Sequence, residues 1–108
     1  MSYEVRTIDS FEKEFKRLAK KFPSLKSDLL LLISDLENNP FQGVSLGKGF
    51  YKIRLKISSK GGGKSGGARI ISFIKIIDRV VYLASIYDKS ERSSISEKEL
   101  KFLANQIG

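Results

Sequence analysis

The chain has 108 residues, a formal net charge of +8, and no Cys, His or Trp. One compact domain over residues 1–108 is expected, because domains commonly have about 100–150 residues. Without Cys and His, the composition excludes a disulfide framework, zinc hydrolases and catalysis that needs a thiolate or an imidazole.

The chain has no pattern typical of a membrane or secreted protein. Its longest apolar run, 29–33, is far shorter than the about 20 residues that cross a bilayer. Residues 1–10 contain no apolar core of signal-peptide length. A cytoplasmic protein with no membrane partner is therefore expected.

The first elements predicted along the chain are a short strand and two helices. Polar and apolar residues alternate over 3–7, which is typical of a strand. Asp9 and Glu12 have the spacing of a capping box, and apolar residues at helical spacing predict helices over about 10–21 and 24–37. Because only a few residues around Pro23 separate them, we expect an antiparallel helical hairpin.

Three strands and one helix are predicted in the rest of the chain. After a loop with several glycines, residues 50–57 alternate between an apolar and a basic face, which predicts a strand. Residues 69–77 and 80–87 are rich in Ile and Val and predict two strands joined by a two-residue turn at Asp78 and Arg79. Ser96 and Glu99 form a second capping box, and the apolar stripe after them predicts a final helix.

The resulting order, β-α-α-β-β-β-α, indicates an α+β fold. We expect an antiparallel twisted sheet with an N-terminal helical hairpin and a C-terminal helix. The strands over 69–77 and 80–87 are apolar on both faces in places, so they are expected at the centre of the sheet, with the helices packed on one face.

The positive charge is concentrated in the middle of the sequence. Residues 1–40 and 80–108 each have no net charge, whereas residues 41–79 carry nine basic side chains and a single acidic one, Asp78. A charge localised in this way suits a polyanion such as nucleic acid, or an acidic protein. The alternative, a solvated basic face that binds nothing, stays open.

The glycine-rich run over 60–67 is similar to the end of a nucleotide-binding P-loop, because Gly63, Lys64 and Ser65 match its last residues. Ser58 replaces the first glycine of that motif, and a strand rather than a helix is predicted after the run, so we reject a P-loop. Two interpretations stay open: a plain connecting loop, or a loop that presents Lys60 and Lys64 to a phosphate backbone.

Three short runs follow one another on neighbouring predicted elements. KSGGAR at 64–69 enters a strand, IYDKSE at 86–91 leaves the next strand, and ISEKE at 95–99 opens the last helix. Together they resemble the RelE/HigB-type toxins of bacterial type II toxin–antitoxin modules, in the RelE/ParE superfamily. The resemblance covers nearly the whole chain.

This resemblance implies a RelE-like fold and a ribosome-dependent endoribonuclease that cuts mRNA and inhibits translation without a metal ion or cofactor. In the implied reaction the mRNA 2′-hydroxyl attacks the adjacent phosphate and the 5′-oxygen leaves. The implied partners are the ribosome, mRNA and a cognate antitoxin. The antitoxin is expected to be acidic, to be encoded by an adjacent gene, and to provide the contact with operator DNA.

The resemblance also implies roles for individual residues. Arg69 is expected to stabilise charge on the phosphate, since a guanidinium stays charged and holds two oxygens. Lys89 is expected to act as acid or charge stabiliser, and Lys64 to contact a backbone phosphate. Arg54 is the central basic residue of the preceding strand, and Tyr87 is expected to stack on a base or orient the 2′-hydroxyl. The other basic residues expected to bind RNA are Lys48, Lys52, Lys56 and Lys60.

The chain departs from the family pattern at one place. Many such toxins carry a Tyr several residues after the basic residue that ends the last strand, whereas this chain has Ser93, Ser94 and Ile95 there. The general base is therefore not assigned. Structural roles stay open, such as packing of Tyr87 on the last helix. Two other functions also stay open: a ParE-like toxin that binds DNA gyrase without cleaving RNA, and a basic RNA-binding module.

Overall fold

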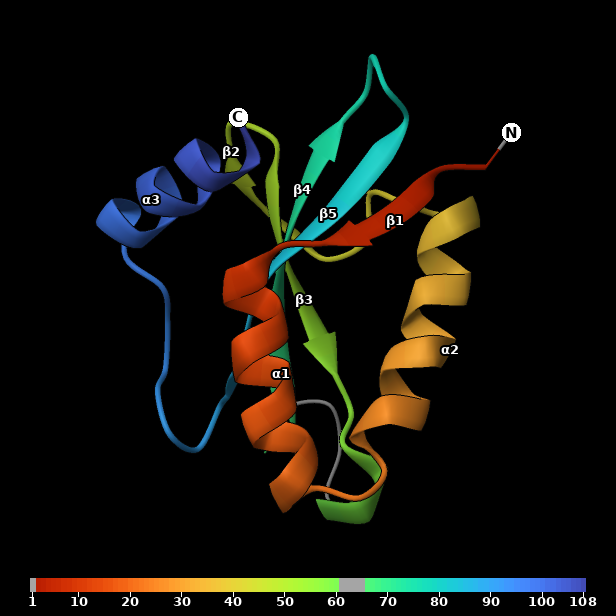
Figure 1. The fold of residues 1–108 in the computed structure, drawn as a ribbon, viewed down its shortest axis with the longest axis vertical. Coiled ribbons are helices and arrows are strands. Elements are labelled where there is room, and N and C mark those ends of the chain that lie inside the picture. The colour runs from red at the N-terminus through yellow and green to blue at the C-terminus, as the bar shows by residue number, and fades with distance from the viewer. Residues whose placement is uncertain (1, 61–65) are drawn as a thin grey trace.

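A computed structural model of the chain describes residues 2–60 and 66–108. Within this part, the helices and strands follow the predicted order with one additional strand (Figure 1). The elements are β1 (Glu4–Thr7), α1 (Asp9–Lys21), α2 (Leu25–Asn38), β2 (Val44–Gly47), β3 (Phe50–Leu55), a short 3-10 helix η1 (Ser58–Lys60), β4 (Ala68–Lys75), β5 (Val80–Asp88) and α3 (Glu97–Ile107).

The strands form one sheet with the order β1-β5-β4-β3-β2. β1 pairs in parallel with β5, and all other neighbours are antiparallel. β4 and β5 lie inside the sheet, as their Ile- and Val-rich sequences predict. The predicted α+β class is therefore confirmed, and the predicted antiparallel pairing holds for every neighbouring pair of described strands except β1 and β5.

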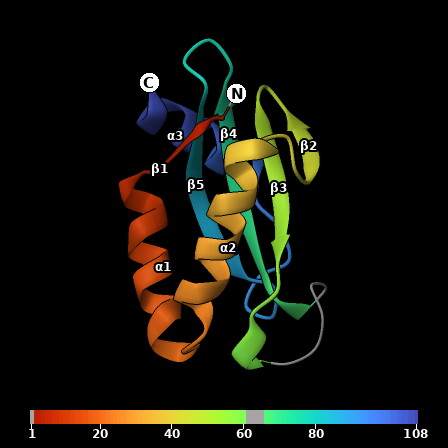
Figure 2. The ribbon, with the colours of Figure 1, turned by 90° about the vertical axis from the view of Figure 1, so that its right-hand side faces the viewer.

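Helices cover both faces of the sheet, so the prediction of helices on one face is wrong. In Figure 2, α2 lies in front of the sheet, α1 stands to its left and α3 lies behind it. α1 and α2 contribute Phe11, Leu18 and Leu25 to the larger core, whereas Leu103 of α3 packs with Ile71 on the other face. The apolar residues on both faces of β4 and β5 explain this arrangement, because each face has to be covered.

The two predicted capping boxes have different outcomes. At α3 the box is confirmed: the Ser96 hydroxyl accepts from the Glu99 backbone N–H, and the Glu99 carboxylate accepts from the Ser96 N–H. At α1 it is wrong, because the helix begins at Asp9 itself and no side chain caps it. Glu12 instead accepts a 2.7 Å hydrogen bond from the Thr7 hydroxyl.

Two turns differ from the sequence-based prediction. The glycine-containing loop after α2 contains β2, which is joined to β3 by a two-residue turn. Lys48 and Gly49 in this turn have φ of 55° and 88°, as a type I′ turn requires. Between β4 and β5 the turn spans four residues rather than two, since β4 already ends at Lys75. Lys75 pairs with Val80, so Asp78 and Arg79 are only the last two residues of the turn.

Candidate functional site

Three predicted site residues form one row across the sheet. Arg54 of β3 lies opposite Arg69 of β4, and Arg69 lies opposite Tyr87 of β5. Residues directly opposite each other on adjacent strands share a face of the sheet. Ile53 and Leu55 point into the core under α1 and α2, so alternation along β3 places this row on the face that carries α3.

A cavity of about 490 Å³ lies beside this row. Four predicted basic residues line it: Lys52 and Arg54 from β3, Arg69 from β4, and Lys89 from the turn after β5. Its other lining residues are Gln42, Gly43, Val44, Ile53 and Ser93. Because none of these described lining residues is Asp or Glu, the wall of the cavity is cationic.

Two glycines allow the backbone to pack closely around the cavity. A Cβ at Gly43 would collide with the carbonyl oxygen of Lys52, and Gly43 also has a φ of 94°. A Cβ at Gly67 would collide with the carbonyl oxygen of Leu55. The Gly67 carbonyl accepts a 3.1 Å hydrogen bond from the Lys89 backbone N–H. Gly67 therefore connects the strand that carries Arg69 with the turn that carries Lys89.

The two arginines of the cavity differ in their freedom to move. Arg69 is only 4% exposed, and its Nη1 donates to the Ala68 carbonyl at 3.2 Å. Arg54 is exposed at the cavity wall. The packing thus holds the Arg69 guanidinium inside the protein and leaves the Arg54 side chain at the surface.

Tyr87 belongs to this row, and its side chain is buried under α3. The residue is 2% exposed, and the Arg92 guanidinium lies 4.9 Å from its ring centroid. Burial raises the pKa of Tyr87 despite the opposing charges of Arg92 and Arg69, so the phenol stays neutral at physiological pH. Its hydroxyl is buried and has no hydrogen-bond partner among the described residues. In this structure the ring packs in the core under α3 and is not open to a base.

The other predicted basic residues lie away from this cavity or outside the described residues. Lys60 is paired with the buried Asp88, at 2.8 Å between Nζ and Oδ1. Lys48 lines a separate groove of about 450 Å³ beside α3. Lys56 is exposed beyond the end of β3 and does not line the cationic cavity. Lys64 falls within 61–65, outside the described residues.

Sequence reasoning missed several residues around the site. Gln42 and Ser93 line the cavity with neutral polar side chains, but no periodicity or motif marks them. Asp88 is fully buried and bound to Lys60, its partner 28 residues earlier in the chain. The only signal for Asp88 was its place inside the IYDKSE run, which gives no hint of the partner.

The described residues contain neither a metal-binding cluster nor a membrane-spanning helix. No group of three or more His, Cys, Asp or Glu side chains in this part of the chain is placed to hold a metal ion. None of the helices described has the length and apolar character needed to cross a membrane.

Comparison with known proteins places the chain in a family. Residues 11–107 match the family described as the RelE toxin of the RelE/RelB toxin–antitoxin system. A free-state double mutant of E. coli toxin RelE has a similar fold, with a TM-score of 0.62 and 16% identity over 98% of this chain and 94% of that chain. The isolated E. coli RelE toxin gives a TM-score of 0.62 and 17% identity, over 96% of this chain and 98% of that chain.

A third similar structure is the toxin–antitoxin complex RelBE2 from Mycobacterium tuberculosis. Its TM-score is 0.60 at 15% identity, over 87% of this chain and 95% of that chain. At these identities the three structures support the fold alone. The family match is broader evidence, because it extends from within α1 to the end of α3. The chain therefore belongs to the RelE toxin family of RelE/RelB toxin–antitoxin systems.

Proposed function

We propose that this chain is the toxin of a type II toxin–antitoxin system and a metal-independent endoribonuclease that cuts mRNA on the ribosome. The observation that carries this proposal is the cationic cavity, in which Lys52, Arg54, Arg69 and Lys89 converge from three parts of the chain. Attack on a phosphodiester builds negative charge on the phosphate oxygens, and fixed cations at that point stabilise the transition state.

In the proposed reaction, Arg54 and Arg69 bind the non-bridging oxygens of the scissile phosphate. The register supports this role, since the two residues lie directly opposite each other on β3 and β4. A guanidinium can hold two phosphate oxygens at once. The buried Arg69 supplies a fixed contact, and the exposed Arg54 closes onto the anion from the neighbouring strand.

Bond making and bond breaking then take place at this phosphate. The 2′-oxygen forms a bond to phosphorus and its proton passes to solvent, while the bond from phosphorus to the 5′-oxygen breaks. Lys89 donates a proton to the leaving 5′-oxygen. The products are a 2′,3′-cyclic phosphate and a 5′-hydroxyl. Lys52, on the same wall, binds a flanking phosphate.

The first test measures mRNA cleavage in a translation reaction with purified components. Arg54→Ala, Arg69→Ala and Lys89→Ala are each expected to slow cleavage about 100-fold or more, because loss of one transition-state contact typically has an effect of this size. Lys75→Ala is the matched control, since Lys75 is a basic residue of β4 paired with Asp78 and outside the cavity. It should cleave at the wild-type rate.

Full activity in all three cavity variants would show that the site is elsewhere. A known ribosome-dependent nuclease serves as the positive control for the ribosomes. If that nuclease cuts mRNA and the wild-type protein does not, the proposed function is overturned. Far-UV circular dichroism of each variant separates a lost contact from a lost fold, which matters most for the buried Arg69.

The proposal includes a cognate antitoxin as partner. It is supported by the family match and by the similar M. tuberculosis structure, which is a toxin–antitoxin complex. The net charge of +8 favours an acidic antitoxin, since complementary charges speed association. Co-expression with the product of an adjacent reading frame should suppress cleavage. Failure to form a complex with any such product would count against this part of the proposal.

The two alternatives make different predictions. A toxin that binds DNA gyrase has no need for four cations around one cavity, and it would inhibit gyrase supercoiling at stoichiometric amounts. A plain RNA-binding module would bind RNA with steep salt dependence and leave it intact. We favour the nuclease because the cations converge on a cavity rather than spreading over a flat surface.

A further inference from the structure

The turn after β5 connects the cationic cavity to α1 on the opposite face of the sheet. Tyr87 and Asp88 are consecutive residues of β5, so their side chains point to opposite faces. Tyr87 faces α3 and the cavity side, whereas Asp88 faces α1 and η1. Lys89 follows directly and lines the cavity. Whatever holds the residues around Lys89 therefore determines where its ammonium group can reach.

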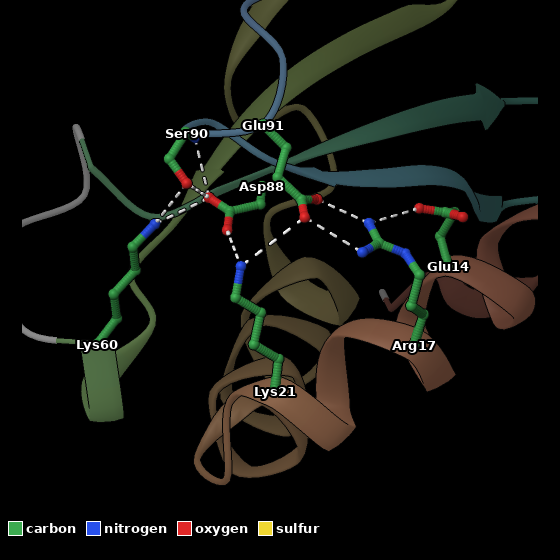
Figure 3. Close-up of polar contacts among 7 residues, drawn as sticks. All are labelled: Glu14, Arg17, Lys21, Lys60, Asp88, Ser90 and Glu91. Atoms are coloured by element: carbon green, nitrogen blue, oxygen red, sulfur yellow. Dashed lines mark hydrogen bonds and ion pairs between the residues drawn. The ribbon is translucent and has the colours of Figure 1, made fainter.

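Asp88 is a fully buried carboxylate with several hydrogen bonds. Its Oδ1 accepts from Lys60 Nζ at 2.8 Å, from the Ser90 N–H at 3.0 Å and from the Ser90 hydroxyl at 2.8 Å (Figure 3). Burial by itself would raise the pKa of Asp88, but the bonds from Lys60 and Ser90 outweigh it and hold the pKa below its usual value. Asp88 is thus an anion at neutral pH and binds both η1 and its own turn.

Glu91 connects the other end of the turn to α1. Arg17 donates to both of its carboxylate oxygens, at 2.7 Å and 3.2 Å (Figure 3). Lys21 Nζ lies between the two carboxylates, 3.8 Å from Asp88 Oδ2 and 3.8 Å from Glu91 Oε2. We refer to Asp88, Glu91, Lys60, Lys21 and Arg17 as the clamp.

These charged groups stabilise the fold, but burying Asp88 also costs desolvation free energy. A buried ion pair is weak support for stability, because desolvation offsets most of the attraction. Asp88 Oδ2 is buried without a hydrogen bond, which adds to that penalty. The position of the clamp indicates a second role, in placing Lys89. The four cations of the cavity repel one another, and Lys89 sits on a turn rather than on a strand, so it is the one most easily displaced.

We propose that the clamp positions Lys89: Asp88 and Glu91, held by Lys60, Lys21 and Arg17, fix the turn so that Lys89 stays at the cavity wall against the repulsion of the other cations. The inference rests on the proposed nuclease function. None of these five residues lines the cavity, so in this proposal they do not contact the scissile phosphate or the reacting atoms. They act through Lys89, in the way that supporting residues commonly hold a catalytic group in place.

The test uses the full-length protein in the mRNA cleavage assay described above, with rates measured at saturating ribosomes. Glu91→Arg, Arg17→Glu and Asp88→Asn are each expected to lower the cleavage rate about 10- to 100-fold, the scale expected for a misplaced catalytic group. Apparent affinity for ribosomes should change little. The exchanged pair Arg17→Glu with Glu91→Arg should recover most of the rate, because it restores the attraction.

Glu14→Gln is the matched control. Glu14 also binds Arg17, at 3.1 Å, but both residues belong to α1, so this pair does not connect α1 to the turn. It should cleave at the wild-type rate. Asp88 is buried, so its variant could fail to fold; Glu91 and Arg17 are exposed enough to tolerate substitution, and they keep the proposal testable.

A double-mutant cycle separates positioning from plain stability. If the clamp acts through Lys89, then Glu91→Arg should have no further effect on the residual rate of Lys89→Ala. An equal loss in both backgrounds would overturn the proposal, and so would wild-type rates in Glu91→Arg and Arg17→Glu. In both of these outcomes the wild-type protein still cleaves mRNA. Failure of the proposed nuclease function is different, because then the wild-type protein does not cleave at all.

Discussion

At the scale of single residues, Tyr87 changes most between sequence and structure. The sequence-based prediction gave it a role in base stacking or in orienting the 2′-hydroxyl. In the structure Arg92 covers its ring, and its buried hydroxyl has no hydrogen-bond partner among the described residues. We therefore interpret Tyr87 as the buried packing residue of the row, with no direct part in the chemistry.

Tyr87→Phe tests this interpretation. Removing a buried hydroxyl that has no partner should leave the protein as stable as before, or more stable by about 1 kcal/mol, because the desolvation penalty disappears. Cleavage should stay within about twofold of the wild type, as no contact to RNA is lost. Urea unfolding and the cleavage assay measure the two effects. A large loss of cleavage in a stably folded Tyr87→Phe protein would restore the original role.

The basic residues show how far sequence reasoning reaches at this scale. Alternation along β3 places Lys52 and Arg54 together on one face, and the KSGGAR and IYDKSE runs marked Arg69 and Lys89. The prediction for Lys60 stays untested, but its ammonium group is already bound to Asp88. A pairing of this kind depends on where the chain returns in space, and no local pattern records it.

At the scale of elements, the errors arose where the sequence signal is shortest. β2 has only four residues and lies at the edge of the sheet, so its alternation is too brief to distinguish it from a loop. The prediction also placed α3 on the wrong face of the sheet. β4 and β5 have apolar residues on both faces, so each face of the sheet needs a helix to cover it. Long amphipathic helices and strands were predicted well, because periodicity accumulates over many residues.

The capping of α3 and α1 gives a matched pair of variants. Ser96→Ala removes a hydroxyl that accepts a 3.1 Å bond from the Glu99 N–H, and should destabilise the protein by about 1 kcal/mol. That loss corresponds to a fall in Tm of about 4–8 °C for a domain near this size. Asp9→Ala should have a clearly smaller effect, since Asp9 lies inside α1 and makes no capping bond. Equal losses in the two variants would contradict the assigned caps.

At the scale of the whole molecule, two buried carboxylates attach η1 to the rest of the fold. Asp28 of α2 accepts from the Ser58 N–H at 2.9 Å and from the Ser58 hydroxyl at 2.7 Å. Asp88 of β5 accepts from Lys60 at 2.8 Å. η1 is thus held between a helix on one face and the end of a central strand. This arrangement makes the end of the sheet nearest the cationic cavity depend on ionised carboxylates.

The same two residues predict how stability depends on pH. Burial raises the pKa of each carboxyl, but the hydrogen bonds to each outweigh burial, so both pKa values lie below the usual value of an aspartate in the folded protein. A carboxyl with a lowered pKa stabilises the folded state above its unfolded pKa, and that contribution is lost as the pH falls through the folded pKa. The free energy of unfolding should therefore be nearly constant above about pH 5 and decline below about pH 4.

Urea unfolding between pH 2.5 and 8 checks this dependence, with pH values chosen to span the range in about half-unit steps. The variant Asp28→Asn, Asp88→Asn should be less stable than the wild type at pH 7, because it loses the charged hydrogen bonds. Its stability should fall less steeply in acid, so that the two curves approach each other toward low pH. Parallel curves would mean that other carboxylates, such as Glu91 and Glu99 with their arginine partners, control the acid sensitivity.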